Sequence, residues 1–136
     1  YSTAELKKKL YAKEYSAAEI SQVIQECTRH GFLNDEHYAE NLAAAVYARG
    51  GGKRKAIQKL RTKGIDSEVI KETLAEKEDG NVMSELEAAT GALARKASAF
   101  AREPDPRKRR EKALRFLAGR GFSAQVAYEA LRKLAM

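Results

Sequence analysis

Apolar residues recur along most of the chain at intervals of three and four positions, which places them on one face of an α-helix. The run from Ser84 to Arg102 shows the pattern in its longest form. Its apolar positions, at spacings of 3, 4, 4 and 3, are Leu86, Ala89, Leu93, Ala97 and Phe100. No segment shows the sustained alternation of apolar and polar residues that is typical of a β-strand. The pattern therefore predicts an all-α fold.

Helix-start and helix-stop signals divide this pattern into eight helices. Ser2 with Glu5, and Ser16 with Glu19, have the spacing of a capping box, which satisfies free backbone N–H groups at a helix N-terminus. Glycines mark most of the ends, and Gly80 with Asn81 is expected to break the fifth helix. We expect the helices to begin at or just after Ser2, Ser16, Asn34 or Asp35, Lys53, Asp66, Ser84, Asp105 and Ser123.

A hairpin of two helices occurs three times, at offsets of 50 and 57 residues, in Leu10–Ser16, Leu60–Asp66 and Leu117–Ser123. Each segment has a leucine, a basic residue three positions later, an apolar residue two beyond that, and then an N-cap residue. The second and third hairpins follow a further helix, which predicts a repeating three-helix module. We expect stacked modules to form an elongated, curved molecule. The expected domains are 1–33 (a first module lacking its first helix), 34–80 (the second module) and 81–136 (the third).

The net charge of the chain is +7, and the excess is concentrated on the middle helix of each module. Six of the eleven residues in Lys53–Lys63 are basic and none is acidic, whereas Asp66–Glu87 holds eight acids and two lysines. Basic helices at equivalent places in a repeat favour a surface that binds nucleic-acid phosphates or an acidic protein groove. The residues expected to make this contact are Lys53, Arg54, Lys55, Lys59, Arg61, Lys63, Arg107, Lys108, Arg109, Arg110 and Arg115.

Four aromatic residues lie near the basic helices. Tyr15 and Phe122 immediately precede an N-cap residue, where an apolar side chain packs onto the next helix, so we expect both to be buried. Tyr11 and Tyr47 fit equally well in a core or in a stacking contact with the bases of a single strand.

The residues that enzymes and metal sites require are missing from the pattern. Gly50–Lys53 lacks the spacing and the strand of a phosphate-binding loop. His30 and His37 are the only histidines, and Cys27, on an apolar stripe, is expected to be an inert core thiol. We therefore expect no catalytic residue, no bound metal, no cofactor and no enzymatic activity.

Targeting signals are also missing. No apolar run is long enough for a membrane span, and lysines interrupt the first apolar stretch. A single cysteine excludes an internal disulfide, which favours the reducing cytoplasm. Because the chain begins with Tyr1, we expect an upstream segment to have been removed.

Three neighbouring motifs resemble one known family. They are Gly31–Asp35 with Tyr38-Ala39, Ala48–Gly52, and Ile57–Leu60 with Lys63-Gly64-Ile65. Together they resemble the RecX family, regulators of the RecA recombinase, and weaker similarity in Ser2–Leu10 and Arg115–Phe122 extends the resemblance to nearly the whole chain. The family often has an aromatic residue between the glycines and a proline after them, where this chain has Gly51 and Lys53. Three successive glycines predict a flexible joint here.

The resemblance implies a regulatory protein that binds RecA filaments on single-stranded DNA and inhibits ATP hydrolysis, strand exchange and coprotease function in recombination, DNA repair and the SOS response. The expected partners are the RecA filament and single-stranded DNA, with duplex DNA as a further candidate, and the expected state is a monomer. One alternative is a nucleic-acid-binding helical module that acts independently of RecA. Another is a helical scaffold for an acidic protein.

Overall fold

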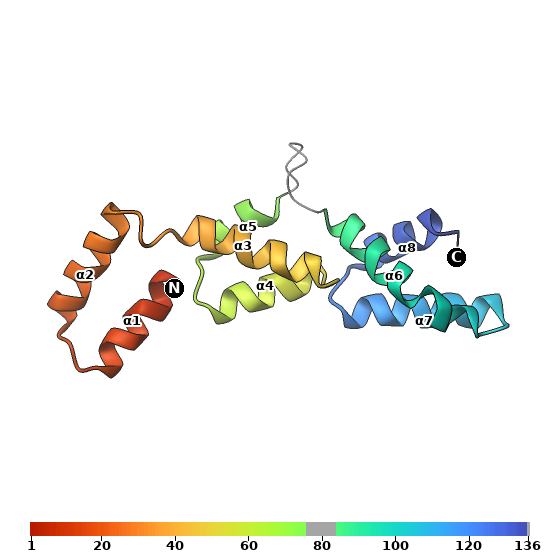
Figure 1. The fold of residues 1–136 in the computed structure, drawn as a ribbon, viewed down its shortest axis with the longest axis horizontal. Coiled ribbons are helices and arrows are strands. Elements are labelled where there is room, and N and C mark those ends of the chain that lie inside the picture. Colours follow the sequence, from red (N-terminus) through yellow and green to blue (C-terminus); the bar gives the residue numbers. More distant parts are fainter. Residues whose placement is uncertain (76–83, 136) are drawn as a thin grey trace. The chain divides into compact units, whose positions relative to one another are not determined.

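The computed structural model of the chain describes residues 1–75 and 84–135 (Figure 1). Within these ranges every regular element is an α-helix, so the all-α prediction is confirmed. The helices are α1 (Thr3–Ala12), α2 (Ala17–Arg29), α3 (Asp35–Ala48), α4 (Lys53–Thr62), α5 (Ser67–Leu74), α6 (Glu85–Ala101), α7 (Pro106–Gly119) and α8 (Ala124–Lys133). The expected break at Gly80 and Asn81 lies outside the described residues.

The predicted capping residues begin these helices. Ser2 and Ser16 form complete capping boxes: each hydroxyl accepts the N–H of the glutamate three residues on, and that carboxylate accepts the serine N–H. Asn34 caps α3, because its side-chain oxygen accepts the His37 N–H at 3.0 Å. Asp35 is therefore in the first turn of α3, where its carboxylate binds a different helix.

The C-terminal turns of α1, α4 and α7 share one backbone geometry. The carbonyls of Leu10, Leu60 and Leu117 each accept the N–H of the residue five positions on, at 3.3, 3.1 and 3.1 Å. The fourth residue after each leucine has a left-handed backbone, with φ of 66° at Glu14, 76° at Gly64 and 93° at Gly121. This agreement shows that the hairpin recognised in the sequence is a structural repeat.

The helices form two compact units, each of which includes parts of α3 and α4. The first contains Tyr1–Leu42 and Gln58–Ala75, with a core of Ile20, Leu33, Ala39, Leu60, Ile65, Ile70 and Leu74. The second contains Ala43–Ile57 and the described residues from Ser84 onward. In this unit α6 packs on α7 and α8 (Figure 1). Eight of its buried residues are alanines, whose small side chains allow the helices to approach closely: Ala43, Ala56, Ala88, Ala89, Ala92, Ala113, Ala127 and Ala130.

Two equivalent aromatic side chains differ in burial. Phe122 is 2% exposed, as predicted, but Tyr15 is 48% exposed, so the prediction that it is buried was wrong. The reason is that α1 has no buried residue and α2 has one, Ile20, which leaves Tyr15 little core to pack against. Cys27 is half-buried and so lies at the edge of a core. On the longer helices, Ala45 and Ala97 are exposed although both fit the apolar spacing.

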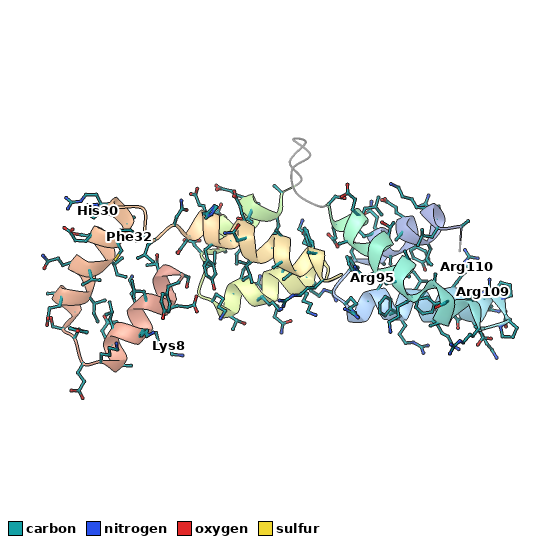
Figure 2. All side chains as sticks on the ribbon, viewed as in Figure 1. Lys8, His30, Phe32, Arg95, Arg109 and Arg110 are labelled. Carbon is teal, nitrogen blue, oxygen red and sulfur yellow. The ribbon has the colours of Figure 1, made fainter. Side chains whose placement is uncertain are left out.

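The three successive glycines between α3 and α4 belong to the second unit and are buried in it. A Cβ on Gly50 would lie 2.8 Å from Nη2 of Arg95, which is labelled on α6 in Figure 2, and 3.2 Å from Cβ of Ala92. A Cβ on Gly52 would lie 2.5 Å from the carbonyl carbon and oxygen of Gly121. The expectation of a flexible joint is therefore corrected, since these glycines allow helices to pack where no side chain would fit.

Candidate nucleic-acid interface

Helix α4 presents basic side chains to solvent without an acidic neighbour on the same helix. Lys53, Arg54 and Arg61 are exposed, and Lys55 and Lys59 are half-buried. Arg54 and Arg61 are two turns apart and therefore share one flank of the helix. Neither side chain forms an ion pair with any residue that the structure describes. Both guanidinium groups can therefore reach an anionic partner.

Lys63, just after α4, has a different role from its neighbours. Its ammonium nitrogen lies 3.6 Å from Oε2 of Glu5, and its backbone carbonyl accepts the Ser2 hydroxyl at 2.8 Å. Ser2 is fully buried, and its hydroxyl also accepts the Glu5 N–H at 3.2 Å. Lys63 thus holds the N-terminus of α1 as well as contributing positive charge.

A network of polar groups completes this joint between α1, α3 and α4. Oδ1 of Asp35 accepts the backbone N–H of Thr3 at 2.8 Å and its hydroxyl at 3.1 Å. Hydrogen bonding from the Ser2 backbone N–H and from the Tyr38 hydroxyl, together with the charge of Lys63, lowers the pKa of Glu5. Burial, the bond to Glu5, and the negative charges of Glu5 and Asp35 raise the pKa of Tyr38 to about 12.

The basic residues of α7 divide into exposed groups and a structural one. Lys108, Arg110 and Arg115 are exposed, and Arg107 lies 3.9 Å from Glu111, which is also exposed, so water screens the pair strongly. Arg109 instead donates from Nε and Nη2 to the Glu103 carbonyl at 3.2 and 3.1 Å, closing the α6–α7 connection. Figure 2 shows Arg109 and Arg110 at this end of α7.

Nearby, Lys112 donates to Oε2 of Glu103 at 2.8 Å, and this bond lowers the pKa of that carboxyl group. Of the basic residues predicted on α7, Arg109 is the one whose side chain hydrogen-bonds to a backbone carbonyl, while Lys108, Arg110 and Arg115 remain exposed to solvent.

Helix α1 adds basic residues that the predicted site omitted. Lys7 and Lys8 are exposed, form no ion pair with a described residue, and lie within one turn of Tyr11, which is 57% exposed. Tyr47, the other aromatic residue whose role the sequence left open, is 7% exposed and belongs to a core. The internal repeat could have identified this surface, because Lys8 aligns with Arg115, and Tyr11 with Arg61.

The turn between α2 and α3 exposes the most accessible large apolar side chain among the described residues. Phe32 is 78% exposed, its ring lies 6.1 Å from that of His30, and Figure 2 shows the two residues together. The Phe32 N–H donates to the Cys27 carbonyl at 2.8 Å, while the next residue, Leu33, is buried. The charge pattern gave no reason to select Phe32, which is a candidate contact for a protein partner.

The described residues contain no group of three or more histidine, cysteine, aspartate or glutamate side chains that could hold a metal ion. Within the same residues, no helix is long and apolar enough to cross a membrane.

These features define a class of helical repeat protein built from three-helix modules. Two family models match the chain: the RecX second three-helix domain over residues 34–74, and the RecX third three-helix domain over residues 84–131. The chain belongs to the RecX family.

Curated relatives agree with this assignment over nearly the full chain. The Regulatory protein RecX of Trichlorobacter lovleyi is 34% identical, and the match covers 98% of this chain and 86% of the relative. The Regulatory protein RecX of Pelodictyon phaeoclathratiforme is also 34% identical, over 100% of this chain and 81% of the relative. The crystal structure of RecX from Lactobacillus salivarius has the same fold, with a TM-score of 0.85 at 21% identity, and the match covers 98% of this chain and 85% of that one.

Proposed function

We propose that this protein binds RecA filaments on single-stranded DNA and inhibits their ATPase, strand-exchange and coprotease activities. The observation that carries the proposal is the pair of exposed arginines on α4, Arg54 and Arg61, which have no ion pair with a described residue in a chain that belongs to the RecX family. The regulator acts through binding and has no catalytic step of its own. It works as a monomer in the cytoplasm, during recombination and DNA repair.

The same proposal divides the chain into a first module at 1–33, a second at 34–80 and a third at 81–136. The repeated turns of α1, α4 and α7 support this division, because each closes one hairpin. Each module then supplies a middle helix with lysines or arginines exposed to solvent. Those exposed cations can contact DNA phosphates, acidic groups of the filament, or both.

The central test is the ATPase rate of RecA on single-stranded DNA, measured with near-stoichiometric amounts of the protein. We expect strong inhibition by the natural chain. Arg54→Glu with Arg61→Glu should weaken it severalfold, because the reversed charges repel an anionic partner. The matched control is Lys96→Glu with Lys133→Glu, which makes the same change in net charge at exposed residues of α6 and α8.

The outcomes separate the proposal from its alternative. An unchanged ATPase rate with the natural chain would refute RecA regulation. Tight duplex DNA binding with an unchanged ATPase rate would instead favour a module that acts independently of RecA. The exposed acids Glu68 and Glu72 on α5 count against that alternative, since α5 is the second helix of its hairpin and would have to enter the major groove. Equal inhibition by the double arginine variant and its control would remove this flank of α4 from the interface.

A further inference from the structure

Tyr11 occupies a solvent-facing position on α1 between groups that suit a single-stranded nucleic acid. Its side chain is 57% exposed and forms no hydrogen bond or ring contact with any residue that the structure describes. Lys7 and Lys8 precede it by four and three positions, so both flank it on the same side of the helix. An aromatic face beside two free ammonium groups is the combination that binds a base and its phosphates.

The internal repeat gives this surface its context. Lys8 aligns with Gln58 on α4 and Arg115 on α7, and Tyr11 aligns with Arg61 on α4. Arg61 and Arg115 are exposed. The repeat positions that Tyr11 and Lys8 occupy in α1 therefore also face solvent on the other middle helices. Module 1 thus places an aromatic ring where module 2 places a guanidinium group. Figure 2 shows the labelled Lys8 side chain on α1.

We propose that Tyr11 stacks on a base of single-stranded DNA while Lys7 and Lys8 contact the adjacent phosphates. This inference rests on the proposed function for the presence of single-stranded DNA, and it adds a base contact on a helix outside the predicted site. The backbone around the ring is fixed, because the Tyr11 carbonyl accepts the Glu14 N–H at 3.0 Å in the closing turn. Stacking therefore requires little ordering of the protein backbone.

The first experiment measures the affinity of the full chain for a fluorescein-labelled oligo-deoxythymidine strand. We expect Tyr11→Ala to weaken binding about fivefold or more, the lower end of what base stacking contributes. Tyr11→Phe keeps the ring and should stay within twofold of the natural chain. Tyr128→Ala is the matched control, because Tyr128 lies on α8 with a similar exposure of 53%. Circular dichroism verifies that each variant keeps its helicity.

The second experiment separates base contacts from phosphate contacts. On a strand of abasic residues, the natural chain and Tyr11→Ala should bind with equal affinity, because no base is present to stack. Lys8→Gln should reduce the slope of log affinity against log salt by about 0.7, the value for one single-strand phosphate. Tyr11→Ala should leave that slope unchanged on either strand.

Three results would overturn the inference. Equal affinities of Tyr11→Ala and Tyr128→Ala for the oligo-deoxythymidine strand would refute stacking while leaving RecA regulation intact. An equal loss of affinity of Tyr11→Ala for the abasic strand would show that the ring contributes to binding without contacting a base. Weaker ATPase inhibition by Tyr11→Ala with unchanged DNA affinity would instead assign Tyr11 to the protein partner. Failure of the natural chain both to bind the strand and to inhibit RecA would refute the proposed function itself.

Discussion

Replacing Gly52 with serine tests whether close backbone packing holds the α3–α4 turn against the turn between α7 and α8. The Gly52 N–H donates to the Arg120 carbonyl at 2.8 Å, and the Arg54 N–H donates to the Gly121 carbonyl at 3.1 Å. A Cβ at position 52 would lie 2.5 Å from the Gly121 carbonyl and 2.6 Å from the Phe122 nitrogen. These are backbone atoms, so no side-chain rotation can relieve the overlap.

The size of the effect follows from the displacement. Ordinary contact begins near 3.4 Å, so the two backbones must separate by about 0.9 Å, which stretches both hydrogen bonds beyond useful length. Each bond contributes roughly 0.5–1.5 kcal/mol net, which gives a loss of about 2 kcal/mol. Serine is the sharper substitution because it is a better N-cap residue than glycine, so capping alone would predict a small gain in stability.

The measurement is urea denaturation of Gly52→Ser beside Gly91→Ala as a matched control. A Cβ on Gly91, within α6, meets no atom within 4 Å, so alanine there should raise the free energy of unfolding by about 0.5–1 kcal/mol. Gly52→Ser should lower the same quantity by about 2 kcal/mol. A Gly52→Ser variant as stable as the natural chain would refute the packing argument.

Three further predictions concern the turn of α1, the pH dependence and the shape. Glu14→Gly should raise the free energy of unfolding by about 1 kcal/mol in urea, because Glu14 has a φ of 66°, a region that costs a side chain energy; an equal or lower stability would contradict this. The pKa of Tyr38 is raised to about 12, so the stability that the neutral Tyr38 hydroxyl contributes is present below pH 10 and is lost toward pH 12. The pKa of Glu5 is lowered, so the stability that the Glu5 carboxylate contributes is lost as pH falls below about 4.5. Tyr38→Phe should therefore make the melting temperature fall less between pH 10 and 12 than it does in the natural chain. An equal fall in both proteins would contradict the role assigned to the Tyr38 hydroxyl. The stacking of modules expected from the repeat in the sequence predicts a radius of gyration in X-ray scattering above the roughly 14 Å of a compact chain of this length, and a value near 14 Å would contradict that expectation.

The features that the sequence predicted well depend on residues close together in the chain. Ser2 with Glu5 predicted a capping box because the bonding partners are three positions apart, and the structure forms both bonds. The repeated turn was equally accessible, since its hydrogen bond joins residues five positions apart. Local patterns of this kind determine where helices begin and end.

The features that the sequence analysis missed depend on contacts with residues that are distant in the sequence. Tyr15 and Phe122 have the same local pattern, yet only Phe122 is covered by a core. The glycine run indicated flexibility because nothing in the local sequence shows that Gly121 packs against Gly52. Likewise, charge spacing could not separate Arg109, which bonds to the Glu103 carbonyl, from its exposed neighbour Arg110. Burial and partners at these positions are properties of tertiary packing.

The two joints between middle helices follow one chemical rule with different atoms. At α4 the C-cap carbonyl of Lys63 accepts the Ser2 hydroxyl, and at α7 that of Arg120 accepts the Gly52 N–H, each at 2.8 Å. Ser2 uses its hydroxyl because its own N–H is occupied by Glu5, whereas Gly52 has only its backbone to offer. The residue after each accepting carbonyl is glycine.

Those glycines are what a joint of this geometry requires. A Cβ on Gly64 would overlap Cβ of Ala4, and one on Gly121 would lie 2.8 Å from the Lys55 nitrogen. The helix that packs on each turn, α1 at Gly64 and α4 at Gly121, therefore occupies the space that a side chain at this position would need. The equivalent residue of α1 is Glu14, which has the same left-handed backbone but carries a long acidic side chain. A further joint of the same geometry on the turn of α1 would thus need glycine at position 14. At the equivalent position of the other two turns, glycine is present, and there the N-terminus of another helix packs against the turn.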